Sequence, residues 1–299
     1  MRQAALISQK RIGAPASRPA AARRAKIRRF RPASDLVLLV LLLIFTLPIV
    51  WMVLLSFEPD RVIVTPAWNF AFTWDNITAL WAPDQPYTTQ MLNSVIIVLG
   101  TVALCGSVSV LTGYALAKLH MSRWLSIPIL VACAVLPLTP PMTLVPGFYV
   151  TLAQLGILGT LPGLILLNTI FNLPFATLLM KLAMDEVPPS LREAAIIDGA
   201  REGRVLLRIV LPLTAPSLAA TCLFTAIMTW NEFLMGLTMT SGGTTAPLSV
   251  GIASMVQPYD IHWGRMAAAG SLAVVPIILV SIAANRYIIA GLTRGAVKG

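Results

Sequence analysis

The segment from Trp124 to Met180 contains no charged residue. An apolar helix needs only about 20 residues to cross the hydrocarbon core of a bilayer, so this segment is long enough for two crossings. Over the whole chain, 57% of the residues are hydrophobic and 11% are charged, which is unlike a water-soluble domain. A helix satisfies its own backbone hydrogen bonds in lipid. The sequence therefore predicts an all-α integral membrane protein.

Uncharged apolar runs predict six transmembrane helices. They lie near residues 36–57, 92–117, 125–146, 159–180, 216–239 and 268–290. Of the 22 Lys and Arg residues, 20 fall on the side of this arrangement that holds both termini, and only Arg61 and Arg265 fall on the other. By the positive-inside rule, both termini are expected in the cytoplasm. Pro140, Pro141 and Pro174 lie within these runs and predict bent helices.

Charge divides the chain into a basic tail, residues 1–34, and a transmembrane domain, residues 35–299. Ten basic residues precede the first acid, Asp35, and they account for the net charge of +10. Such a tail could bind nucleic acid or anionic lipid. The reading we favour is a disordered tail kept in the cytoplasm by its charge, with no nucleic acid partner. The apolar run that follows is too long for a cleaved signal sequence and is expected to remain as the first span.

The largest loop on the cytoplasmic side, about residues 182–215, is unusually polar. Ser190 and Glu193 form a capping-box pattern after two prolines, which predicts the start of a short helix. Gly199 and Gly203 predict a change of direction before a second amphipathic piece, which Pro212 is expected to close. So short a helix is unstable alone in water and needs a surface to dock on. That surface is either the inner ends of its own spans or a groove on a separate cytoplasmic protein.

This loop carries the pattern E-A-A-x₃-G-x₉-I-x-L-P, met at each fixed position by Glu193, Ala194, Ala195, Gly199, Ile209, Leu211 and Pro212. The pattern resembles the "EAA" loop of permease subunits of bacterial ABC importers. Further stretches agree with the carbohydrate-uptake branch and its second maltose-type permease, namely "LNSVIIV", "GYALAKL", "LGTLPGLIL", "LPFATLLMK", "WNEFL" and the ending "GLTRGAVKG". The resemblance extends from the first span to the C-terminus.

The resemblance implies a type I ABC importer permease fold in the bacterial plasma (inner) membrane. It also implies four kinds of partner: a second homologous permease, two cytoplasmic ABC ATPase subunits, an extracytoplasmic substrate-binding protein and membrane lipid. The loop helix would be the coupling helix that contacts the ATPase, with Asp198 added to the seven motif residues. A C-terminal tail would also reach the ATPase, and it comprises Gly295, Ala296, Val297, Lys298 and Gly299.

The sequence lacks the G-x-x-x-x-G-K-[ST] loop that holds nucleotide phosphates. We therefore expect a transport subunit that is not an enzyme and binds no cofactor, with ATP and Mg²⁺ on the partner ATPase. The three cysteines, Cys105, Cys133 and Cys222, lie in apolar runs without metal-like spacing, so neither a disulfide nor a metal site is expected. A membrane enzyme is a weaker alternative because the sequence contains no H-E-x-x-H or G-x-S-x-G motif.

Polar residues within the predicted spans are few. The candidates for the substrate path are Asn168, Asn172, Asn231 and Glu232. The amides could hydrogen-bond sugar hydroxyls or could join helices to one another. Glu232 could relay protons in an ion-coupled secondary transporter, the main rival class, or could bond across helices. The expected cargo is a sugar or oligosaccharide, with a glycerophosphate compound as the alternative solute.

Overall fold

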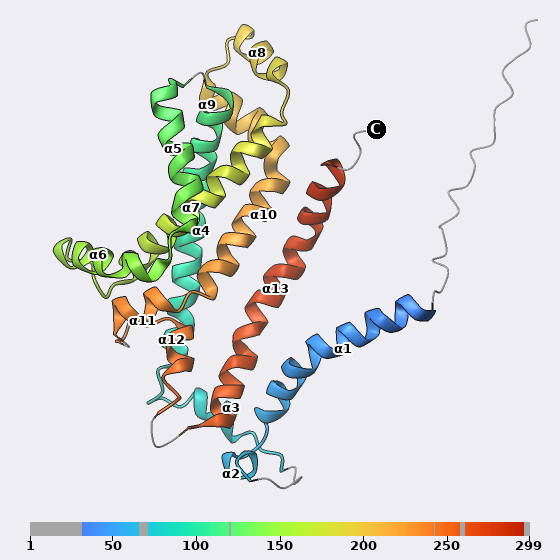
Figure 1. Cartoon of the computed structure of the whole chain (residues 1–299), viewed down its shortest axis with the longest axis vertical. Coiled ribbons are helices and arrows are strands. Elements are labelled where there is room, and N and C mark those ends of the chain that lie inside the picture. Colours follow the sequence, from blue (N-terminus) through green and yellow to red (C-terminus); the bar gives the residue numbers. More distant parts are fainter. Residues whose placement is uncertain (1–31, 66–70, 120, 242, 258–260, 296–299) are drawn as a thin grey trace, which may run out of the picture. The chain divides into compact units, whose positions relative to one another are not determined.

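The computed structural model describes residues 32–295 except 66–70, 120, 242 and 258–260, and it describes side chains from residue 35 to residue 283. These residues form helices joined by loops (Figure 1). The chain divides into two compact units between Leu47 and Pro48. The predicted basic tail lies outside the described residues, apart from the first helical turn after Pro32. The predicted boundary at residue 34 therefore remains a prediction.

The first unit contains most of helix α1, Pro32–Leu55. The segment Asp35–Leu55 has a mean hydropathy of 3.0 and carries Asp35 as its only acid. Its apolar side chains cover every face of the helix, since the sequence shows no polar stripe. A helix that is apolar all round suits a membrane span. This helix matches the first predicted span, 36–57.

The second unit contains four further long helices. They are α4 (Tyr87–Lys118), α7 (Leu161–Asp185), α10 (Leu211–Trp230) and α13 (Trp263–Gly295). Helix α4 packs most extensively against α7, and α10 packs against α4, α7 and α13. Figure 1 shows these helices running alongside one another. Together with α1 they give five described helices that are long and apolar enough to cross a membrane.

The third predicted span, 125–146, bends at Pro140 and Pro141 as predicted, but the structure breaks it into separate helices and ends it later, at Gln154. Helix α5 (Arg123–Val135), the short turn η1 (Leu136–Leu138) and α6 (Pro141–Gln154) replace it, and the chain bends by 111° between them. Pro140 and Pro141 lack the N–H groups that would continue the helix, and the residue before each proline is extended, with ψ near 124°. If the bent pair counts as one span, the total is six.

The fifth predicted span, 216–239, is shifted in the structure. The helical stretch starts at Glu202 and ends at Trp230. A separate helix, α11 (Leu234–Thr240), follows it, and α12 (Leu248–Ala253) comes next. At the far end of the bundle lie α2 (Asp60–Ile63) and α3 (Asp75–Leu80).

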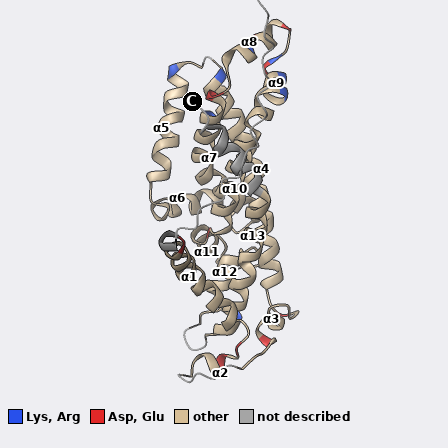
Figure 2. Ribbon diagram, turned by 90° about the vertical axis from the view of Figure 1, so that its right-hand side faces the viewer, with Lys and Arg blue, Asp and Glu red and all other residues tan. Residues whose placement is uncertain are grey.

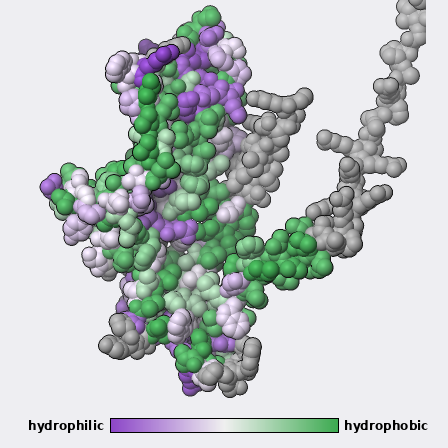
Figure 3. Space-filling model, viewed as in Figure 1, coloured by the Kyte–Doolittle hydropathy of each residue, from purple (hydrophilic) through white to green (hydrophobic). Residues whose placement is uncertain are grey.

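Three clusters of buried apolar side chains lie along the bundle. The cluster at the α8 end, here called the inner cluster, is formed by Val110, Tyr114, Met180, Met184, Val187, Val205, Leu206 and Val210. Figure 2 shows that most of the described Lys and Arg residues gather at this end of the bundle, whereas Asp and Glu lie at both ends, near α8 and α9 and near α2 and α3. Hydrophobic surface covers much of the length between the ends (Figure 3). This is the surface expected of a protein surrounded by lipid.

Candidate functional site

The loop between α7 and α10 contains helix α8, Pro189–Ile197, as the sequence predicts. The predicted capping box is wrong, because α8 has no side-chain hydrogen bond at its start. The helix begins one residue before Ser190, with Pro188 at the N-cap and Pro189 at the first helical position. Proline suits that position because its ring fixes a helical φ and its missing N–H would be unpaired there. Ser190 therefore lies inside the first turn and cannot cap it.

Gly199 ends α8 in a left-handed conformation, with φ of +81°. The N–H of Gly199 donates to the Ile196 carbonyl at 2.9 Å, and the N–H of Ala200 donates to the Ala195 carbonyl at 2.9 Å. These two bonds form a Schellman motif, which satisfies carbonyls at a helix end. The predicted change of direction at Gly199 is confirmed. Gly203 lies inside the next helix and does not have a positive φ.

Helix α8 presents an outward face that nothing in the described chain covers. Glu193, Ala194, Ile196 and Asp198 are exposed, and Ile197 is 85% exposed. Ala195 is half-buried and packs against the inner cluster. In Figure 3 the hydrophilic surface at this end of the molecule surrounds the loop. The first half of the sequence motif is therefore available to another molecule.

The second half of the motif belongs to the bundle. Helix α9 (Glu202–Val205) continues through a π-helical segment, η2 (Leu206–Val210), directly into α10. Ile209 and Leu211 pack against the inner cluster, so they are not on the outward face of α8.

Pro212 does not close the amphipathic piece, contrary to the prediction. The N–H of Leu211 donates to the Leu206 carbonyl five residues back, so the wide turn comes immediately before Pro212. A proline lacks the donor for the usual bond four residues back, and the wider turn accommodates it. The helix therefore runs on past Pro212.

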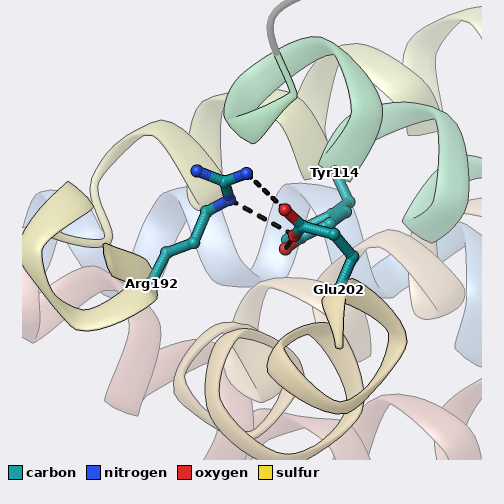
Figure 4. A network of polar contacts seen from close by, with 3 residues as sticks. All are labelled: Tyr114, Arg192 and Glu202. Atoms are coloured by element: carbon teal, nitrogen blue, oxygen red, sulfur yellow. Dashed lines mark hydrogen bonds and ion pairs between the residues drawn. The ribbon is translucent and has the colours of Figure 1, made fainter. Parts of the chain in front are cut away.

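A polar network that the sequence did not predict joins the loop to α4 (Figure 4). The Tyr114 hydroxyl donates to Glu202 Oε2 at 2.5 Å, and Arg192 Nε donates to the same oxygen at 3.2 Å. Arg192 Nη2 pairs with Glu202 Oε1. The hydrogen bonds to Glu202 raise the pKa of the Arg192 guanidinium above its ordinary value, so Arg192 stays charged.

Lys118, one helical turn beyond Tyr114 on α4, makes a second link to the loop. Its Nζ atom donates to the Val187 carbonyl at 2.6 Å, just before α8 begins. Tyr114 and Lys118 both belong to the stretch "GYALAKL", which was noted only for its resemblance. A sequence reading has no signal for contacts between residues so far apart.

The three candidate asparagines bond to their own helices. The Nδ2 atoms of Asn168, Asn172 and Asn231 donate to the carbonyls four residues earlier, at 2.8–2.9 Å. Asn168 is buried, Asn172 is half-buried and Asn231 is exposed. None of the hydrogen bonds of these amides within the described chain joins two helices.

Glu232 caps the start of α11. Its two carboxylate oxygens accept from the N–H groups of Met235 at 2.7 Å and Gly236 at 3.0 Å. The carboxylate thus satisfies two amides that a helix start leaves unpaired. The cross-helix bond considered from the sequence is replaced by this local one.

The predicted C-terminal contact lies almost wholly beyond the described part of the chain. Gly295 is the last residue of α13, and Ala296, Val297, Lys298 and Gly299 lie outside the described residues. Among the residues that are described, no group of three or more His, Cys, Asp or Glu could hold a metal ion.

Comparison with known proteins decides the family. Residues 109–294, which include α7, the α8–α9 loop and α10, match the family described as "Binding-protein-dependent transport system inner membrane component". The chain belongs to this family. This component of a binding-protein-dependent transport system is a multi-pass inner membrane protein and a transport subunit, and the ATPase of such a system is a separate subunit.

Relatives cover most of this transport component. It is 31% identical over 255 residues to the trehalose/maltose transport system permease protein MalG of Thermococcus litoralis, covering 84% of this chain and 91% of the relative. It is 30% identical over 276 residues to the diacetylchitobiose uptake system permease protein NgcG of Streptomyces coelicolor, covering 91% and 90%.

A solved structure has the same fold. A chain of a bacterial ABC transporter involved in the import of the acidic polysaccharide alginate aligns with a TM-score of 0.71. The alignment covers 85% of this chain and 95% of that chain, at 19% sequence identity. The likeness supports the helical architecture described above, including the resemblance to ABC importer permeases.

Proposed function

We propose that this chain is one of two homologous permease subunits of an ATP-driven importer for a sugar or oligosaccharide. The relatives named for trehalose/maltose and diacetylchitobiose support the cargo class, since both cover most of the chain at 30% identity or more. The importer would also contain two cytoplasmic ABC ATPase subunits and would receive its cargo from an extracytoplasmic binding protein. ATP and Mg²⁺ would bind the ATPase pair.

One observation carries the coupling role: the exposed outward face of α8, with Glu193 and Ala194 at its centre. A helix with a partly apolar exposed face suits a groove on another protein. Ile197, at 85% exposure, adds apolar area to the same face. We assign this face to the ATPase, because the chain has no phosphate-binding loop of its own and the energy must arrive through a protein contact.

The proposed motion follows from the connections of α8. Closure of the ATPase pair would move α8 as a rigid body, and the attached α7 and α10 would swing between inward-open and outward-open arrangements. The motif residues Ile209, Leu211 and Pro212 would act by fixing the loop to the bundle. The tail from Gly295 to Gly299 would make the second ATPase contact, with both termini on the cytoplasmic side, as the distribution of Lys and Arg favours.

Asn168, Asn172, Asn231 and Glu232 remain our candidates for the substrate path. Each amide uses one Nδ2 N–H group within its own helix, so its Oδ1 acceptor and its second N–H donor are the groups that would bond a sugar hydroxyl. Asn231 is the exposed member of the set. Glu232 would position Asn231 by holding the turn into α11 in place.

Cysteine crosslinking tests the assignment. An Ala194→Cys variant in the complete complex, with Cys105, Cys133 and Cys222 replaced by alanine, is expected to capture the ATPase. The half-buried Ala195→Cys variant is the matched control and should react less. Reconstitution with and without the ATPase then separates the classes: uptake without it, driven by an ion gradient, would overturn the proposal. Ligand binding by the cognate binding protein would separate a sugar from a glycerophosphate compound.

A further inference from the structure

Helix α8 is held by few contacts. None of its nine residues is fully buried. A helix this short gains too few hydrogen bonds to be stable alone, so its orientation depends on what it touches. Beyond its connections along the chain, α8 packs Ala195 on the inner cluster, contacts α9 and pairs Arg192 with Glu202. Leu191 and Ile196 are 42% and 39% exposed, so apolar packing holds part of α8, and the ion pair of Arg192 adds a contact of defined direction.

Glu202 is the point where α8 and α4 meet. Its Oε2 atom accepts from Tyr114 on α4 and from Arg192 on α8, and its Oε1 atom pairs with Arg192 Nη2. Figure 4 shows Arg192 and Tyr114 converging on this one carboxylate. Helix α4 is not continuous with the loop, because Tyr114 lies 88 positions before Glu202. The carboxylate therefore connects α8 to a transmembrane helix that the chain does not attach to it.

We propose that Glu202 is a positioning residue that locks α8 to α4, so that a push on α8 moves both as one body. This inference rests on the proposed function, since it assumes that the ATPase acts on α8. Glu202 would pass the motion of α8 to α4, in addition to α7 and α10, the two spans that flank the loop in the chain. We call the three side chains Tyr114, Arg192 and Glu202 the α4–α8 lock.

The charges and the partial burial of the lock suit a role in orienting α8 better than a role in stabilising the fold. The side chains of Arg192 and Glu202 are 20% and 39% exposed, and ion pairs with that much solvent contact add little to folding. The two-point contact between a guanidinium and a carboxylate does fix a geometry, because both groups are planar. Tyr114, in contrast, is 4% exposed and has its ring inside the inner cluster. The lock therefore joins a partly exposed ion pair, Arg192 and Glu202, to the buried Tyr114 side chain of α4.

The link from Lys118 to the Val187 carbonyl strengthens this reading. It ties α4 to the residue just before the start of α8, one turn away from Tyr114. Two separate contacts between α4 and the loop fix the orientation of α8 relative to α4, whereas a single contact would leave α8 able to pivot. Close to the same point, Gly113 brings α4 against the backbone of α7 at Lys181. The inner ends of α4 and α7 thus form one base, and the lock fixes α8 on it.

Loss of the lock is expected to loosen α8 without unfolding it. The Schellman motif at Gly199 and the packing of the Tyr114 ring do not involve the Glu202 carboxylate. Glu202→Gln removes the charge that binds Arg192, and Tyr114→Phe removes the hydroxyl and keeps the ring. Both variants should still assemble with the ATPase. Matched controls are Glu186→Gln, an exposed acid on the same side, and Tyr149→Phe, an exposed tyrosine on α6.

Spin-label distances test the lock directly. Labels are placed at Ser190→Cys, an exposed residue of α8 outside the proposed docking face, and at Ser107→Cys on α4, in the full complex with the three native cysteines replaced. Distances are measured with and without MgATP and vanadate. The intact lock should give one narrow distribution, unchanged by nucleotide. Glu202→Gln and Tyr114→Phe should broaden it and make it shift with nucleotide, while both controls keep the narrow distribution.

Exchange of the pair gives a second readout. Arg192→Glu alone should broaden the distribution, and combining it with Glu202→Arg should narrow it again, which a purely local packing defect would not do. Narrow, nucleotide-independent distances in both Glu202→Gln and Tyr114→Phe would overturn the lock. A different observation would overturn the proposed function, namely that Ala194→Cys in the assembled complex never forms a crosslink to the ATPase. The distances measured without nucleotide still judge the lock in that case.

Discussion

The Oδ1 atom of Asp60 accepts a 2.7 Å hydrogen bond from the backbone N–H of Gly264, 204 positions further along the chain. Gly264 lies in the first turn of α13, whereas Asp60 belongs to α2. Asp60 therefore caps a helix that is distant from it in the sequence. A carboxylate is favoured at a helix start, where N–H groups are unpaired. This contact ties the loop after α1 to the start of the last span.

Replacement of Asp60 by alanine should destabilise the end of the bundle that holds α2 and α3. Loss of such a cap costs about 1 kcal/mol of unfolding free energy. The melting temperature of the purified protein in detergent should fall by about 2–4 °C. Asp84→Ala is the control, since Asp84 is exposed and its carboxylate bonds only with the neighbouring Gln85 among described residues. Equal melting temperatures for the two variants would show that the Asp60 cap contributes nothing.

Gly199 should tolerate asparagine better than alanine or valine. Its φ of +81° is costly for side chains other than that of asparagine or aspartate, by about 1–2 kcal/mol. Gly199→Ala and Gly199→Val should therefore disturb the end of α8 and reduce ATP-dependent uptake in proteoliposomes, while Gly199→Asn retains most of it. Gly203→Ala is the matched control, because Gly203 is helical with open space around it. Full uptake by Gly199→Val would contradict the coupling role of this turn.

Charge reversal at Glu193 should uncouple transport without affecting insertion. Glu193 is exposed and caps nothing, so Glu193→Lys removes no contact that the described structure shows. We expect normal amounts of protein in the membrane and a loss of ATP-dependent uptake, measured in the reconstituted importer. Asp84→Lys, at the other end of the bundle, controls for charge reversal as such. Wild-type uptake by Glu193→Lys would remove the basis for the proposed ATPase contact.

Glu232 should matter for structure and not as a proton carrier. Because its carboxylate caps α11, Glu232→Ala should lower the unfolding free energy by about 1–2 kcal/mol. Glu232→Gln keeps one oxygen acceptor and cannot titrate, and it should retain most uptake. Uptake assays at several pH values check this. Abolished uptake in a correctly folded Glu232→Gln variant would instead favour an ion-coupled mechanism.

Gly113 should resist even a single added methyl group. A Cβ atom at this position would lie 2.9 Å from the Met180 Cβ and 3.0 Å from the Lys181 backbone nitrogen. Small residues allow membrane helices to approach this closely, and overpacking of such a contact costs about 1–3 kcal/mol. Gly113→Ala should therefore lower the melting temperature, whereas Gly147→Ala, with nothing within 4 Å, should not. Equal stability of the two variants would show that the contact between α4 and α7 at Gly113 accommodates a methyl group without cost.

The sequence predicted those features that depend on neighbours along the chain. Apolar runs located the long helices, since each must hide its own backbone from lipid. Gly199 predicted the turn after α8, because glycine adopts a positive φ at little cost. The family resemblance carried by Glu193, Ala194 and Ala195 was confirmed by the match over residues 109–294. The first two features depend on residues close together in the sequence, and the third depends on similarity to other chains.

The features it did not predict depend on distant contacts or on competing local rules. Tyr114 and Glu202 meet only because α4 packs beside α7 and the loop folds over both. The capping box failed because Pro189 fits the first helical position and moved the helix start before Ser190. Pro212 continues the helix because a wide π turn precedes it. The role of the four substrate-path candidates is still a prediction.

The exposed isoleucine at the end of α8 is a reserve of binding free energy. Ile197 leaves 85% of its surface in contact with water when the subunit is alone. Fully burying an isoleucine side chain gains about 1.5–3 kcal/mol relative to leaving it exposed. A free energy of about 1.4 kcal/mol corresponds to a tenfold change in affinity. The molecule that covers this one side chain would therefore gain at least about tenfold in affinity from it.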